Sequence, residues 1–180
     1  KIIAIIAMTI DHTADLLYPG MPNALIPILF HIIGRITAPI MFFFICEGFH
    51  YTKNLKKYIT RLFIFAIISH FAYCFAFGIN MIPFKTGIFN QTSIMWTLAW
   101  SVVALYIVNG QTKLKEYQKW ILVILLNIIT FPADWSSIGL MIILFMYDNR
   151  GNIKKQMKNV LLWTSIYAIV SFLFVNKVYG

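Results

Sequence analysis

Charged residues are scarce in this sequence. Only 12% of the 180 residues are Asp, Glu, Lys or Arg, whereas 60% are hydrophobic and the mean hydropathy is +0.77. A soluble domain of this length needs far more polar surface to cover its core. The scarcity of charge therefore excludes an ordinary soluble domain, and it favours a protein whose main partner is the lipid bilayer.

Motifs for metal, nucleotide and redox chemistry are also missing. The two cysteines, Cys46 and Cys74, lie inside apolar runs without CxxC spacing, and we interpret both as small buried hydrophobic residues. There is no HExxH motif and no cluster of carboxylates, so we expect no metal site. Neither a Walker-type loop nor a GxGxxG loop is present. The net charge of +9 is divided into short clusters between apolar runs, which argues against a nucleic-acid partner.

Long apolar segments dominate what is present. Several approach the ~20 residues that a helix needs to cross the ~30 Å hydrocarbon layer of a membrane. We predict an all-α fold, a polytopic transmembrane bundle that forms a single domain over residues 1–180, with further spans expected after Gly180. The fifth and sixth segments are short, so a tilted or re-entrant pair is an alternative for them. The seven segments cover residues 2–18, 26–50, 58–78, 92–109, 119–132, 136–148 and 159–176.

Basic residues occur in every second linker. Linkers 51–61, 110–119 and 149–158 hold three or four Lys or Arg each, whereas the linkers between them hold Lys85 alone and the acids Asp15 and Asp134. Cytoplasmic loops of membrane proteins carry an excess of Lys and Arg. We therefore predict a multi-pass protein of the cell membrane with these three basic linkers in the cytoplasm.

Three ionisable residues lie deep inside the first two predicted spans. Asp11 and His12 come about ten residues into the first span, which is roughly 15 Å at 1.5 Å per residue. Arg35 comes about nine residues into the second span, which runs in the opposite direction, and so reaches a similar depth. Such residues cost several kcal/mol in a membrane unless they are paired or hydrated, so they need a structural or functional reason.

Two interpretations of these residues stay open. In the structural one, Asp11 and Arg35 form a buried ion pair and His12 is an interior histidine. In the functional one, His12 is a general base oriented by Asp11, and Arg35 binds an anionic or carbonyl group. Histidine suits this role because its unperturbed pKa of about 6.5 is close to working pH.

A second polar layer lies nearer the cytoplasm. Glu47 late in the second span and Arg61 early in the third are at matching depth, and we predict a structural ion pair between them. The surrounding linker is rich in cations and in hydroxyl and amide groups. This mouth is either an ordinary basic loop or a site for the phosphates of a soluble cofactor. Its candidate cofactor-binding residues are Thr52, Lys53, Asn54, Lys56, Lys57 and Arg61.

The polar residues of residues 1–70, together with their neighbours, form a pattern with a specific order and spacing. The stretches are residues 1–12 ending in Thr9-Ile10-Asp11-His12, Ile33-Gly34-Arg35-Ile36-Thr37-Ala38-Pro39-Ile40, and Glu47-Gly48-Phe49 with Thr52, Asn54 and Tyr58 to Arg61. In this pattern the chain resembles the TraX family, membrane proteins named for the factor that N-acetylates the pilin of a conjugative plasmid. Residues around Asp134-Trp135 and residues 150–157 resemble members from Gram-positive bacteria.

The resemblance implies a multi-span acyltransferase that uses acetyl-CoA from the cytoplasm. It implies an acyl acceptor at the membrane, which is a pilin-like peptide, an envelope glycan or a lipid. On this hypothesis His12, Asp11 and Arg35 form the catalytic group. A proton-coupled transporter, in which the same residues relay protons or bind a solute, and a structural membrane protein are the alternatives.

Overall fold

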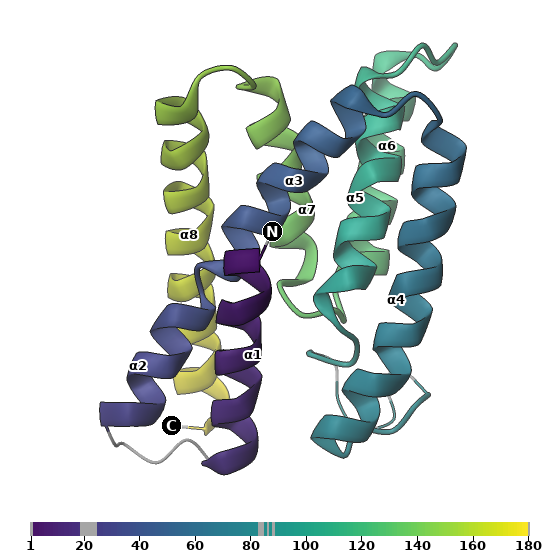
Figure 1. The fold of residues 1–180 in the computed structure, drawn as a ribbon. Coiled ribbons are helices and arrows are strands. Elements are labelled where there is room, and N and C mark those ends of the chain that lie inside the picture. The colour runs from purple at the N-terminus through teal and green to yellow at the C-terminus, as the bar shows by residue number, and fades with distance from the viewer. Residues whose placement is uncertain (1, 19–24, 83–84, 86, 88, 180) are drawn as a thin grey trace. The chain divides into compact units, whose positions relative to one another are not determined.

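The computed structural model describes residues 2–18, 25–82, 85, 87 and 89–179, and the described chain is all-α (Figure 1). Each of the seven predicted segments is helical, and the second is divided in two. Two helical stretches, Leu25–Tyr51 taken across its break and Leu55–Phe77, are long and apolar enough to cross a membrane by length and composition. The helices are α1 Ile2–Leu17, α2 Leu25–Gly34, α3 Thr37–Tyr51, α4 Leu55–Phe77, α5 Ile94–Asn109, α6 Glu116–Thr130, α7 Ser136–Asp148 and α8 Ile153–Tyr179.

The chain forms two compact units, and α3 passes from one to the other. Unit 1 comprises residues 1–44 and unit 2 comprises residues 45–180. In unit 1, α1 and α2 lie side by side and run in opposite directions (Figure 1). The Thr37 hydroxyl at the start of α3 donates to the carbonyl of Ala4 in α1 at 3.2 Å. The Thr37 hydroxyl is buried away from water, and this bond provides the hydrogen-bond partner that it needs there.

The core of unit 2 lies around α5 and α7. Leu98, Val102 and Leu105 of α5 and Leu140 and Ile143 of α7 are fully buried, and these two helices pack against each other. Two buried hydroxyls of α5 have backbone partners, because Ser101 donates to the Thr97 carbonyl at 2.7 Å and Thr97 to the Asp134 carbonyl at 3.3 Å. These two buried hydroxyls therefore remain hydrogen-bonded, as burial requires.

Unit 2 has two chemically different ends. Its helices α4 to α8 run in alternating directions, so that the linkers after α3, α5 and α7 lie at one end (Figure 1). Residues 91–92 and 132–134 pair at the other end, where the Gln91 amide donates to the Pro132 carbonyl at 2.7 Å and the Asp134 amide to the Thr92 carbonyl at 2.9 Å. The first end carries eleven of the thirteen Lys and Arg residues of residues 45–180. The alternation of charge along the sequence thus becomes a difference between two ends of a helical bundle.

Candidate functional site

Asp11 lies on the face of α1 that packs against α2. It follows Ala7 by four residues and precedes Ala14 by three, so it shares the helix face on which both alanines are buried. Gly34 of α2 lies directly against it, because a Cβ at Gly34 would overlap the Asp11 side chain. The absence of a side chain at Gly34 is what lets α2 approach this carboxylate so closely.

The partner of Asp11 is His31. The distance from His31 Nδ1 to Asp11 Oδ1 is 2.7 Å, and both side chains are half-buried. An ionised carboxylate only accepts hydrogen bonds, so Nδ1 carries the proton and Nε2 is the basic nitrogen of the neutral ring. A carboxylate that fixes one nitrogen of an imidazole and thereby selects its tautomer is a recurring device of general-base sites.

His12 and Arg35 lie beside this pair rather than in it. His12 follows Asp11 in α1, about 100° further round the helix, and is half-buried. Arg35 follows His31 by four residues and is exposed. Among the described residues, the ion pair of Asp11 is made with His31 and not with Arg35, so the Asp11–Arg35 pair of the structural interpretation is not formed. His12 as the catalytic base remains a prediction.

Arg35 sits where the second predicted segment breaks. The Arg35 amide still bonds to the His31 carbonyl at 3.0 Å, but the Ile36 amide bonds to Ile33 at 3.2 Å, in the tighter pattern of a helix end. Pro39 has no N–H to donate to the Arg35 carbonyl, which is therefore left without its usual helical partner. The break therefore falls at Arg35 itself, between the end of α2 and the start of α3.

Glu47 makes a different ion pair from the one predicted. Its carboxylate binds Arg150 through two bonds, Nε to Oε1 at 2.9 Å and Nη2 to Oε2 at 3.1 Å, and the guanidinium also lies over the Tyr51 ring at 5.0 Å. The hydrogen bond to Glu47 raises the pKa of Arg150, which stays cationic. Arg61, the predicted partner, is exposed on α4. The fork of Arg150 matches a carboxylate in both bonds, and this geometry explains the exchange of partners.

A shallow hollow of about 390 Å³ lies at the start of α4. Asn54 caps this helix by accepting from the Lys57 amide at 2.9 Å. Four of the six residues predicted to bind a cofactor line the hollow, and Thr52 and Lys53 precede it in the linker. The lining residues are Asn54, Lys56, Lys57, Thr60 and Arg61. Three cations at a helix N-terminus form a donor set that fits phosphate groups.

The arrangement as a whole offers two chemical capacities. Unit 1 holds an oriented imidazole with a guanidinium one helical turn away, and unit 2 holds a hollow lined by three cations. Sequence reasoning placed Asp11 on the first span and Arg35 on the second, which runs against it, but His31 was not among the predicted site residues. The signal for His31 was the row of small residues around Asp11 together with Gly34, which predicts close contact between the two helices at this level.

Comparisons with known proteins identify a family and a curated relative that resemble this chain. A family model described as "TraX protein" matches residues 1–179. The chain is 34% identical over 137 residues to the "Probable fimbrial assembly protein FimC, serogroup H1" of Dichelobacter nodosus. The match covers 75% of this chain and 54% of that protein, so the chain spans about half the length of this relative. No solved structure shows significant similarity to the chain.

Proposed function

The chain belongs to the TraX family, and we propose that it is an integral membrane acyltransferase of fimbrial or pilus assembly. The proposed reaction moves an acetyl group from acetyl-CoA to an amine or hydroxyl acceptor at the membrane. The single observation that carries the proposal is the 2.7 Å bond between Asp11 and His31, one helical turn from Arg35. The fimbrial assembly protein that it resembles supports the biological setting.

The residues of unit 1 suit the proton transfers of this reaction. His31 Nε2 would take the proton from the acceptor as its nitrogen or oxygen attacks the thioester carbonyl carbon. Arg35 would stabilise the negative charge that develops on the carbonyl oxygen. As the new C–N or C–O bond forms and the C–S bond breaks, His31 would return the proton to the departing thiolate. Asp11 would hold the ring throughout and balance the charge of the imidazolium.

The hollow of unit 2 suits the donor side. Lys56, Lys57 and Arg61 would hold the phosphates of acetyl-CoA, and the thioester supplies the activated acyl group. The acceptor is a peptide terminus, an envelope sugar or a lipid, and each offers the amine or hydroxyl that the chemistry needs.

Removing cations from the hollow should weaken donor binding without slowing the chemical step. In membranes supplied with radiolabelled acetyl-CoA and an extract of envelope peptides, glycans and lipids, we expect Lys57→Ala and Arg61→Ala to raise the KM for acetyl-CoA several-fold with little change in kcat. The effect should shrink at high salt, because exposed charges are screened.

Thermal stability provides the control for these variants. Arg61→Ala should leave the Tm unchanged, because Glu47 pairs with Arg150 and not with Arg61. Glu47→Gln, which weakens the paired contact, should lower the Tm while leaving the KM for acetyl-CoA unchanged. Wild-type membranes that transfer no label to any fraction of the extract would contradict the acyltransferase proposal.

The proposed topology has seven spans with the basic end of unit 2 in the cytoplasm. This orientation is supported by the distribution of basic residues. Eleven Lys and Arg residues lie at the proposed cytoplasmic end, whereas Lys85 and Lys177 lie toward the other end in sequence. The spans are α1, the broken helix α2–α3, and α4 to α8. In this arrangement the paired residues 91–92 and 132–134 face away from the cytoplasm.

Cysteine labelling tests the orientation in the natural chain, because Cys46 and Cys74 are buried. A membrane-impermeant maleimide should label Lys85→Cys in intact cells and should label Lys113→Cys only after permeabilisation. Both positions are outside the helices, so neither substitution disturbs a packed face. Labelling of both variants from outside would exclude the seven-span arrangement.

A transporter is the second candidate, because transporters place binding sites at helices broken in mid-membrane. The break at Arg35 and Ile36 is such a feature. In this alternative His31 and Asp11 would exchange protons with a pathway instead of with an acceptor. A wild-type protein that collapses a pH gradient in vesicles and transfers no label would favour the transporter.

A further inference from the structure

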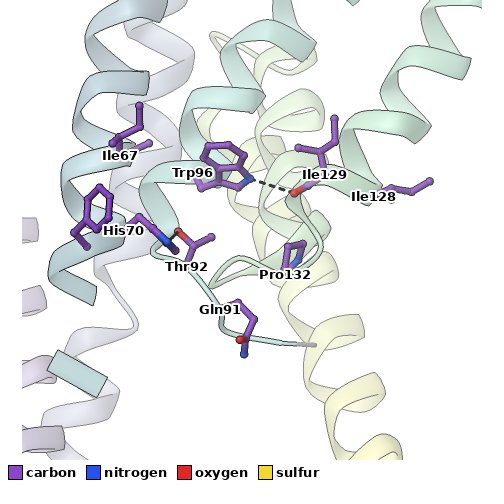
Figure 2. A pocket seen from close by; sticks show the side chains of 10 residues that line it. Ile67, His70, Gln91, Thr92, Trp96, Ile128, Ile129 and Pro132 are labelled. Carbon is purple, nitrogen blue, oxygen red and sulfur yellow. Dashed lines mark hydrogen bonds between the residues drawn. The ribbon is translucent and has the colours of Figure 1, made fainter. Parts of the chain in front are cut away.

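A hydroxyl and an imidazole are paired in unit 2, where α4 meets the segment just before α5 (Figure 2). Thr92 and His70 point toward each other, and both line a partly enclosed pocket of about 510 Å³. Neither residue belongs to the Asp11–His31 pair or to the hollow at the start of α4. In the proposed topology they lie toward the end of unit 2 that faces away from the cytoplasm, so this pair goes beyond the proposed acetyl transfer.

The hydrogen bonds of His70 fix which ring nitrogen is basic. Nε2 lies 3.0 Å from the Met81 carbonyl, which can only accept, so Nε2 carries the proton. Nδ1 is then the basic nitrogen, and the Thr92 hydroxyl donates to it at 3.0 Å. Cys74 Sγ lies further away, 3.8 Å from each ring nitrogen. A hydroxyl bonded to an imidazole that a third group orients is the arrangement of nucleophile and base in covalent catalysis.

The place of Thr92 in the chain also suits a nucleophile. Its backbone is held, because its carbonyl accepts from the Asp134 amide at 2.9 Å. Thr92 directly precedes Ser93, the cap residue of α5, whose side chain makes no capping bond to the helix. The Ser93 hydroxyl instead accepts from Ser69 at 2.8 Å. The first amides of α5 have no carbonyl partner within the helix, so donors that suit an oxyanion follow Thr92 closely in the chain.

The space beside this pair suits an uncharged acyl chain. Ile67 of α4 and Ile128 of α6 line it. The Trp96 ring lines it too, and its N–H is already bonded to the Ile129 carbonyl at 3.1 Å (Figure 2). Among the described residues no Lys, Arg, Asp or Glu lines the pocket, so a charged group would find no counter-ion there. An acyl chain in this space would bring its carbonyl carbon to the Thr92 hydroxyl.

We propose that Thr92 and His70 form a second catalytic site, an esterase that hydrolyses neutral acyl esters. His70 Nδ1 takes the hydroxyl proton as Thr92 Oγ1 attacks the ester carbonyl carbon. The new C–O bond forms, the C–O bond to the alcohol breaks, and His70 returns the proton to the departing alcohol. Water then attacks acyl-Thr92 and gives a proton to His70, which passes it to Thr92 Oγ1 as the acid leaves. The Met81 carbonyl holds Nε2–H throughout and stabilises the imidazolium.

Covalent labelling of the full chain in lipid nanodiscs tests this site. The probe is an alkyl β-lactone with an alkyne tag, which acylates nucleophilic hydroxyls as its ring opens. We expect label on Thr92, located by mass spectrometry, and none in Thr92→Val. His70→Gln should slow labelling by about 10²- to 10⁴-fold, the usual contribution of a general base. The matched control Ser93→Ala should label at the wild-type rate, because Ser93 is a similarly buried hydroxyl that does not line the pocket.

Ester hydrolysis tests the role of the pocket. The wild-type chain should release p-nitrophenol from its acetate and octanoate esters. Ile67→Trp should raise the KM for octanoate several-fold and leave that for acetate nearly unchanged. Ile68→Trp should change neither, because Ile68 is the adjacent residue, is similarly exposed at 60% against 53%, and does not line the pocket.

Two results would overturn the esterase site. One is a wild-type chain that takes up no label at Thr92. The other is a His70→Gln protein that labels at the wild-type rate, which would leave this histidine with a purely structural role. Equal changes in KM for acetate and octanoate in Ile67→Trp would overturn the assignment of the pocket to the acyl chain.

Discussion

Replacing His31 by alanine is expected to lower the kcat of acetyl transfer by about 10²- to 10⁴-fold, the usual contribution of a general base. The expectation rests on the 2.7 Å bond by which Asp11 fixes Nδ1 of this ring and leaves Nε2 as the base. His12→Ala is the matched comparison, because His12 is a half-buried histidine of the same unit that lies outside the pair. It should cost less than about tenfold. Label transfer from radiolabelled acetyl-CoA measures both variants.

Two further measurements separate a base from a merely structural histidine. Imidazole added to the His31→Ala protein should restore part of the activity, since a free imidazole can occupy the vacated space and accept the proton. Asp11→Asn should lower kcat with little change in KM, because an amide donor would select the wrong tautomer of His31. A large loss in His12→Ala with near-normal activity in His31→Ala would return the role of base to His12.

The positions of the helices were predictable because each apolar segment carries its own signal. The predictions used segment lengths, linker composition and the alternation of basic linkers. The structure has a helix at each predicted segment, with bounds that differ by a few residues. The break after Gly34 was not predicted as such, although Pro39 was the reason for it. Pro39 cannot donate to the Arg35 carbonyl, so the helix is interrupted three to four residues before the proline, and the sequence shows the cause more clearly than the place.

The partners of the polar residues were harder to predict than their depths. The depth of a residue along a helix follows from counting residues. Counting predicted that Glu47 lies near the basic end of the chain, as the structure shows. Eleven cations share that end with the acids Glu47, Glu116 and Asp148, and Arg150 is 103 residues away from Glu47 in sequence. Only the packing of the end of α3 against the α7–α8 linker selects it. For the same reason the choice of His31 over Arg35 as the partner of Asp11 required the contact at Gly34.

Gly34→Ala is expected to be the most damaging small substitution in unit 1. The added methyl group would occupy the space of the Asp11 side chain. Either α2 must move away from α1 or Asp11 must rotate, and each movement breaks the bond to His31. Overpacking of this kind typically costs about 1–3 kcal/mol. The activity of Gly34→Ala should fall toward that of His31→Ala, and its Tm should fall as well. Ile33→Ala, at the adjacent and partly exposed position, should lower activity and Tm much less.

A double substitution shows whether the clash with Asp11 is the cause. In the Asp11→Ala background the methyl group of Gly34→Ala meets no carboxylate, so the second substitution should lower the Tm far less than it does in the wild type. Activity should stay low in the double variant, because the carboxylate that orients His31 is absent. The thermal effect would then be relieved while the catalytic effect is not, and this separation follows only if Gly34 serves to bring α2 against Asp11. Strictly additive losses of Tm would show instead that Gly34 matters for a different contact.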